Sequence, residues 1–154
     1  VNYNILQILG MEKVDFIIPK ITEDGLRIGM GMYGKLKNGM NFEEFKILVK
    51  RNMKIDHFKF TKPCKKLIKK VGVLGGSGSF AIEHAIDLGL DCLITADLKY
   101  HDYFKADNKI ILIDIGHYES EKYTKDLIFK HLNEKIPKFA VAIAETNTNP
   151  VNYN

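Results

Sequence analysis

The sequence predicts an α/β protein, with a three-layer α/β/α arrangement around a mostly parallel sheet. From Lys70 onward, short apolar segments alternate with segments that have helical spacing. This alternation favours parallel strands joined by right-handed crossover helices. The expected strands are apolar along their whole length, which is typical of strands covered on both faces.

The first part of the chain, residues 1–62, is expected to be a linking segment that could form part of a neighbouring subdomain. Glycines spread between Glu23 and Gly39 indicate irregular strands or a hairpin with bulges. Its other expected elements are a helix over 2–9, a strand over 14–18 that stops at Pro19, a helix starting at Asn41 with Glu44 completing a capping box, and a short strand over 58–60.

The second part, residues 63–154, is expected to form the α/β domain itself. Hydrophobic spacing and turn residues define its elements. In chain order they are a strand over 71–74, a helix over 79–88, a strand over 91–95, a short helix over 98–106, a strand over 110–115, a long helix over 118–134 and a strand over 139–144.

Composition excludes several classes of protein. The chain has 154 residues, is 45% hydrophobic and 27% charged, and carries a formal net charge of +4, as expected of a globular protein. Its apolar runs are too short to span a membrane, and its start lacks the pattern of a signal peptide. The charge is too small to favour nucleic-acid binding, although the lysines of 65–70 form either a solvated connector or a phosphate-attracting patch.

Two further features concern cysteines and the ends of the chain. Cys64 and Cys92 have no disulfide or zinc-ribbon spacing, so a cytoplasmic location is expected. The chain does not begin with Met, which suggests a fragment of a longer protein. The tetrapeptide Val-Asn-Tyr-Asn occurs at both 1–4 and 151–154, and we have no physical account of this repetition.

Polar and titratable residues follow the expected parallel strands. They are the runs 75–79, 95–97 and 114–117. Ligands of open α/β sheets bind outside the carboxyl ends of the strands, so these runs are expected to share one edge. This convergence is the strongest functional indication in the residues themselves.

The pattern His117-x-x-x-Glu121 predicts a metal-ligand pair. At the start of a helix, this spacing places both side chains on one face, where an imidazole nitrogen and a carboxylate oxygen can share a divalent cation. Glu119 is expected to point elsewhere. The alternative is that acidic residues merely complement the dipole of the helix N-terminus, with His117 nearby by chance. Nitrogen and oxygen ligands without a thiolate are compatible with zinc, iron or manganese.

A second pair, Asp97 and His101, has the same spacing. Asp97 would orient His101 as a general acid or base, or bind metal itself. Asp97 is equally well explained as the N-cap of the following helix.

The glycine-rich run is a candidate phosphate site. Gly76, Ser77 and Gly78 lead towards a helix N-terminus, and Lys99 could assist an anion there. The run also mimics a dinucleotide fingerprint, with Asp97 as the acidic partner. A tight turn without a ligand explains it equally well.

Three segments of the chain, in their order and spacing, resemble the sequences of one known family. The segments KKVGVLGGSGSFAIEHAIDLGLDCLITADLKYHD, LIDIGHYESE and TNTNP are similar to those of the GTP cyclohydrolase I type 2 homologs, the Nif3-like proteins with a dinuclear metal centre. The resemblance covers roughly residues 68–151. It implies an α/β fold, a cytoplasmic location, a toroidal homohexamer and two divalent metal ions per site.

The resemblance also assigns residues. The metal-ligand pair of the family falls on His117 and Glu121, and His101 matches a family histidine. The family has a Thr-Gly-Glu segment where this chain has Thr95-Ala96-Asp97. This difference leaves the role of Asp97 open. The remaining family ligands come from an N-terminal half with a His-His-Pro motif, and this chain contains no His-His pair. The chain therefore resembles the C-terminal portion of a family member.

Three functions follow as hypotheses. The first is a metal-dependent hydrolase acting on a nucleotide or pterin-like substrate, with His101 or Asp97 moving protons. The second is a non-enzymatic, metal-binding or regulatory protein that assembles into a ring. The third is a dinucleotide-binding domain.

Overall fold

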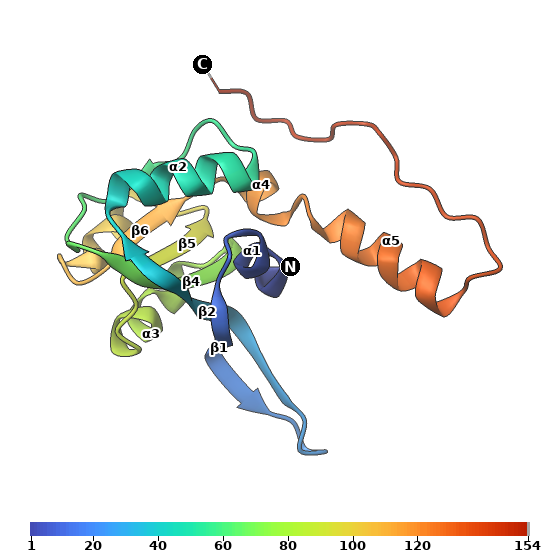
Figure 1. Ribbon diagram of the computed structural model, residues 1–154, viewed down its shortest axis with the longest axis horizontal. Coiled ribbons are helices and arrows are strands. Elements are labelled where there is room, and N and C mark those ends of the chain that lie inside the picture. Colours follow the sequence, from blue (N-terminus) through green and yellow to red (C-terminus); the bar gives the residue numbers. More distant parts are fainter. Residues whose placement is uncertain (154) are drawn as a thin grey trace.

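The computed structural model describes residues 1–153 and shows one twisted sheet with helices on both faces (Figure 1). The sheet has six strands in the order β1-β2-β4-β5-β6-β3. The strands are β1 (Glu12–Ile21), β2 (Arg27–Met40), β3 (Lys59–Phe60), β4 (Ile68–Ser77), β5 (Cys92–Ala96) and β6 (Ile111–Asp114). The helices are α1 (Asn2–Ile8), α2 (Phe42–Met53), α3 (Ile82–Asp87), α4 (His117–Glu121) and α5 (Thr124–Lys135), with 3₁₀ helices η1 (Ser79–Ala81) and η2 (Tyr100–Ala106).

The centre of the sheet is parallel. Strands β4, β5 and β6 pair in parallel, while β1, β2 and β3 add antiparallel pairs at the two sides. The predicted α/β class with a parallel core is therefore confirmed. The antiparallel pairing of β2 with β4 and of β3 with β6 was not predicted, because each pair joins segments that are distant in the sequence.

Two apolar cores cover the two faces of the sheet. Helices α1 and α2 pack on one face, where Leu6, Phe45 and Val49 lie against β4, β5 and β6. Helices α3 and η2 cover the other face, where Ile82 and Ala106 contribute to the second core. The strands alternate between these cores, which explains why they are apolar throughout. The three-layer expectation is confirmed.

Strands β1 and β2 differ from the elements expected in the first part of the chain. The glycine-rich segment over 23–39, expected to form irregular strands or a hairpin, contributes one long strand, β2, which forms a hairpin with the preceding β1 in an irregular register. The predicted stop at Pro19 is wrong, because β1 continues to Ile21. Pro19 is tolerated because β1 is an edge strand of the sheet, where a missing N–H costs no ladder hydrogen bond.

Several bounds in the second part differ from the predicted ones. Strand β4 continues to Ser77, so much of the predicted glycine loop is strand, and the predicted helix over 79–88 begins as the 3₁₀ turn η1. The predicted helix over 98–106 is the 3₁₀ helix η2. The predicted long helix over 118–134 is interrupted between α4 and α5.

Two hydrogen bonds hold the turn at this interruption. The Tyr123 hydroxyl donates to the carbonyl of Met53, and the Lys122 amine donates to the carbonyl of Lys54. Both contacts tie the turn to the end of α2.

The predicted strand over 139–144 is wrong. Residues 140–153 form neither helix nor strand and run back along the molecule after α5 (Figure 1). The segment has strand-forming composition, but a strand also needs a neighbour to accept and donate its backbone hydrogen bonds. Among the described residues, no helix is long and apolar enough to cross a membrane.

Candidate metal centre

The candidate site begins where two parallel strands end. Asp97 follows β5 directly, and Gly116 and His117 follow β6. Gly116 has φ +88°, a conformation that glycine adopts easily, and it turns the chain from the sheet into α4. Asp97 also has a positive φ, +56°, which turns its chain away from β5. The two neighbouring strand ends thus bring Asp97 and His117 together, although they are distant in the sequence.

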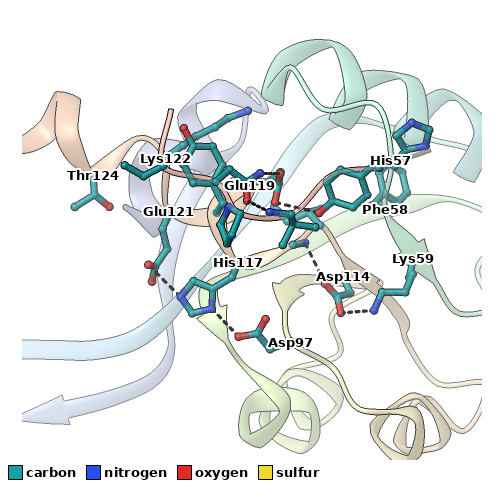
Figure 2. Close-up of a pocket in the computed structure, with 18 of the residues that line it drawn as sticks. His57, Phe58, Lys59, Asp97, Asp114, His117, Glu119, Glu121, Lys122 and Thr124 are labelled. Carbon is teal, nitrogen blue, oxygen red and sulfur yellow. Dashed lines mark hydrogen bonds and ion pairs between the residues drawn. The ribbon is translucent and has the colours of Figure 1, made fainter. Parts of the chain in front are cut away.

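His117 lies between two carboxylates (Figure 2). Its Nδ1 atom is 2.6 Å from Oδ2 of Asp97, and its Nε2 atom is 3.3 Å from Oε2 of Glu121. The side chain of His117 is 54% exposed, that of Asp97 46% and that of Glu121 49%. The hydrogen bond with Asp97, more than any other contact, raises the pKa of His117 above its usual value. The predicted same-side placement of His117 and Glu121 is confirmed.

Gly76 makes room for the pair. It is buried at the end of β4, has φ +70°, and a Cβ atom there would lie 2.9 Å from Oε1 of Glu121. Its N–H donates to the Ser120 hydroxyl at 2.8 Å, and its carbonyl accepts from the Thr95 hydroxyl at 3.1 Å. The Ser120 hydroxyl in turn donates to the carbonyl of His117 at 2.8 Å. These bonds connect the ends of β4 and β5 to α4.

Two other carboxylates nearby already have partners. Asp114, 3% exposed, accepts hydrogen bonds from the N–H groups of Leu98 and Gly116 and lies 3.5 Å from the Lys59 amine. Glu119, 9% exposed, accepts from the Asn149 amide at 3.1 Å and the Tyr153 hydroxyl at 3.3 Å. Both carboxylates are therefore held by neighbouring groups, and Glu119 is directed to Asn149 and Tyr153 and not to His117.

A cavity of about 940 Å³ opens beside His117 and Glu121 (Figure 2). Its wall combines acidic, basic and aromatic side chains from the strand ends, α4, α5 and the C-terminal segment. The wall includes Phe58, Lys59, Tyr118, Lys122 and Lys125. The volume is in the range of cavities that hold small-molecule ligands.

The His117–Glu121 pair fits a divalent cation as two of its ligands. Nitrogen and oxygen ligands at about 2.0–2.1 Å from a tetrahedral ion are separated by about 3.3–3.4 Å. The observed separation of Nε2 and Oε2 is 3.3 Å. Within residues 1–153, however, no three His, Cys, Asp or Glu side chains converge so that they could hold a metal ion. The described chain therefore offers a pair of ligands and not a complete coordination shell.

Of the other predicted site residues, Asp97 and Gly76 adjoin this pair, and His101 has a different partner. Asp97 contacts His117, and no hydrogen bond or ion pair joins it to His101 in the part of the chain described; His101 instead packs against the Tyr100 ring, with centroids 5.5 Å apart. Gly76, Ser77, Gly78 and Lys99 lie outside the wall of the cavity. The N–H of Gly76 is already used by Ser120, so it is not free for a phosphate.

The comparisons with known proteins give the family. The family model described as Duf34/NIF3 (NGG1p interacting factor 3) matches residues 1–150. The chain belongs to this family. A protein of Bacillus subtilis named GTP cyclohydrolase 1 type 2 homolog is 32% identical over 150 residues, which are 92% of this chain and 39% of that protein. A Nostoc protein of the same name is 33% identical over 131 residues, which are 83% of this chain and 48% of that protein.

Solved structures agree on the fold. A Bacillus cereus protein described as related to NIF3 superposes with a TM-score of 0.86 at 18% identity, over 99% of this chain and 69% of its own. Reduced HcgD from Methanocaldococcus jannaschii superposes with a TM-score of 0.67 at 20% identity, over 88% and 51% of the two chains. The predicted Nif3-like fold is confirmed. The chain spans less than half the length of the two curated relatives named above.

Sequence reasoning missed two features of the site. The first is the contact of Asp97 with His117, although both were placed at one sheet edge; i, i+4 spacing drew attention to His101 instead. The second is the set of hydrogen bonds that Asn149 and Tyr153 donate to Glu119. For the second feature, the sequence contains one indication, the TNTNP segment that includes Asn149, but not its contact with Glu119, which depends on where the C-terminal segment returns.

Proposed function

We propose that His117 and Glu121 are two ligands of a divalent-metal centre in a metal-dependent hydrolase that acts on a nucleotide or pterin-like substrate. The observation that supports this proposal is the 3.3 Å separation of Nε2 and Oε2 at the wall of a cavity. Membership of the family adds support, since curated relatives carry the name GTP cyclohydrolase 1 type 2 homolog. Two protein ligands are fewer than the three or four of usual sites, so further ligands have to come from outside this chain.

The residues around the pair suit such a role. A bound divalent cation would supply Lewis acidity and lower the pKa of a bound water. His117 would hold the cation through Nε2, and Glu121 through Oε2. Lys122 and Lys125 line the same cavity and would attract an anionic group of the substrate, while Phe58 and Tyr118 offer apolar surface to a planar ring.

The proposal includes assembly into a homo-oligomer, a hexamer by resemblance. Its support is the protruding hairpin of β1 and β2 (Figure 1), which carries exposed apolar side chains. Ile21 is 70% exposed, Leu26 60% and Met30 53%. Exposed apolar side chains that gather on one element are typical of interaction surfaces.

The metal site is tested by His117→Ala and Glu121→Ala. We expect each variant to bind Zn²⁺ at least about tenfold more weakly than the unchanged chain in isothermal titration. Removing a residue that only hydrogen-bonds to a metal ligand already lowers metal affinity by about that factor, and removing a ligand itself should cost at least as much. Both side chains are about half exposed, so the melting temperature is expected to stay the same. The matched controls are His131→Ala and Glu134→Ala on α5, which lie outside the cavity. Unchanged Zn²⁺ affinity in both site variants would refute the assignment.

Turnover distinguishes the enzymatic role from a binding role. The full-length protein, loaded with metal, is incubated with GTP and related nucleotides, and the products are separated by chromatography. We expect metal-dependent conversion of at least one nucleotide. Zn²⁺ binding that depends on His117 and Glu121, without conversion of any nucleotide, would instead favour the non-enzymatic metal-binding role.

A further inference from the structure

We propose that Asp97 is a positioning residue that holds the proton of His117 on Nδ1 and so leaves the Nε2 lone pair facing Glu121. This inference rests on the proposed metal centre and adds a residue to it. It replaces the three sequence-based hypotheses for Asp97, which were orienting His101 for proton transfer, direct binding of metal and capping of the following helix, whose N-cap is Lys99.

The two distances at the imidazole carry the argument. A neutral imidazole has one N–H donor and one acceptor nitrogen, and its neighbours decide which nitrogen keeps the proton. Asp97 lies 2.6 Å from Nδ1, whereas Glu121 lies 3.3 Å from Nε2. A charge-assisted N–H···O bond has its optimum near the shorter of these lengths. The proton is therefore held at Nδ1, and Nε2 is the nitrogen that can bind a cation.

The geometry also separates Asp97 from the ion. Nδ1 and Nε2 are on different edges of the ring, so a carboxylate on Nδ1 and a cation on Nε2 do not meet. This agrees with the finding that Asp97, His117 and Glu121 do not converge as a three-ligand group among the described residues. A carboxylate that accepts the second N–H of a metal-binding histidine fixes its tautomer and ring orientation and raises its basicity.

Asp97 is held firmly on both sides along the chain. Before it, the Thr95 hydroxyl donates to the carbonyl of Gly76 at 3.1 Å. After it, the N–H of Leu98 donates to the buried carboxylate of Asp114 at 3.0 Å. Between these anchors, the positive φ of Asp97 directs its side chain to His117 (Figure 2). The side chain thus reaches His117 from a fixed backbone, as a positioning role requires.

The test is Asp97→Gly, studied first without metal. Glycine adopts the positive φ of this position without strain, so the variant removes the carboxylate and is expected to fold. Nitrogen NMR of the neutral His117 ring, at a pH above its pKa, reports which nitrogen carries the proton. We expect the Nδ1–H form in the unchanged chain and the Nε2–H form, preferred by free histidine in water, in Asp97→Gly. We also expect Zn²⁺ to bind about 10–100-fold more weakly to the variant.

Two controls make the result specific. Asp107→Gly removes an exposed aspartate that also has a positive φ, +42°, and it is expected to change neither the tautomer nor Zn²⁺ affinity. Glu121→Ala is expected to weaken Zn²⁺ binding while leaving the proton on Nδ1. An Nε2–H ring in the unchanged chain, or the same tautomer with and without the Asp97 carboxylate, would overturn the inference.

The tautomer is read in the metal-free chain. Failure of the metal proposal, seen as unchanged Zn²⁺ affinity in His117→Ala, is therefore distinguishable from failure of the Asp97 assignment.

Discussion

Single residues decided which parts of the site could be predicted. His117 and Glu121 were found because one helical turn separates them. In the structure, Nε2 of His117 lies 3.3 Å from Oε2 of Glu121. Asp97 was found as a residue but with another partner, because its contact with His117 spans two strands and leaves no periodicity in the sequence. The need for glycine at position 116 had no sequence signal, since it depends on the direction in which the chain leaves β6.

The requirement for glycine at position 116 gives a prediction. Gly116→Ala would place a Cβ atom at φ +88° and in contact with the Glu119 carboxylate and, at 2.6 Å, with the Tyr153 hydroxyl. We expect the free energy of unfolding in urea to fall by about 1–3 kcal/mol. Gly89→Ala is the matched control, because its φ is also positive, +63°, but no heavy atom lies within 4 Å of its Cβ position. An equal loss in both variants would show that the contacts around Gly116 contribute nothing.

Whole elements were predicted well where local signals exist and poorly where they depend on partners. The helix that starts at Asn41 has the predicted capping box, with Asn41 and Glu44 exchanging side chain–backbone hydrogen bonds of 3.0 Å. Strand β1 continued past Pro19 because the edge of a sheet tolerates proline. The segment over 139–144 stayed outside the sheet because strand propensity alone provides no hydrogen-bonding neighbour.

The capping box gives the prediction for an element. Asn41→Ala removes the side-chain oxygen that accepts from the N–H of Glu44, and we expect a loss of about 0.5–2 kcal/mol in the free energy of unfolding. The loss affects the whole fold, because α2 buries Phe45, Val49 and Met53 in the core. The control Asn133→Ala, within exposed α5, is expected to be neutral or slightly stabilising, since alanine favours a helix interior. Urea denaturation followed by circular dichroism measures both.

The whole molecule divides into a covered sheet and exposed extensions. Strands β5 and β6 are buried along their entire length between the two cores, whereas every residue of α5 is at least partly exposed. The three-layer core was predictable from the sequence because continuous apolar strands need cover on both faces. The positions of α5 and of the segment after it were not, because few apolar contacts place them.

This division predicts different rates of backbone-amide hydrogen exchange in the sheet and in α5. Backbone amides of β4, β5 and β6 are expected to exchange by global opening, whereas those of α5 exchange by local opening and much faster. Mass spectrometry of the chain at a concentration where it is monomeric measures the difference. If α5 were as protected as the sheet under these conditions, the exposed arrangement of α5 would be wrong.

The hydrogen bonds that join Thr95, Gly76, Ser120 and His117 have a consequence for engineering. Because the same bonds close the end of the sheet and carry the imidazole, a change of cation preference cannot be sought by altering them without also loosening the scaffold. Thr124 and Lys125 line the same cavity and take no part in these bonds, whereas the Lys122 amine helps to hold the turn before α5 through the carbonyl of Lys54. A library that varies Thr124 and Lys125 would explore new ion and ligand preferences while the scaffold keeps its form.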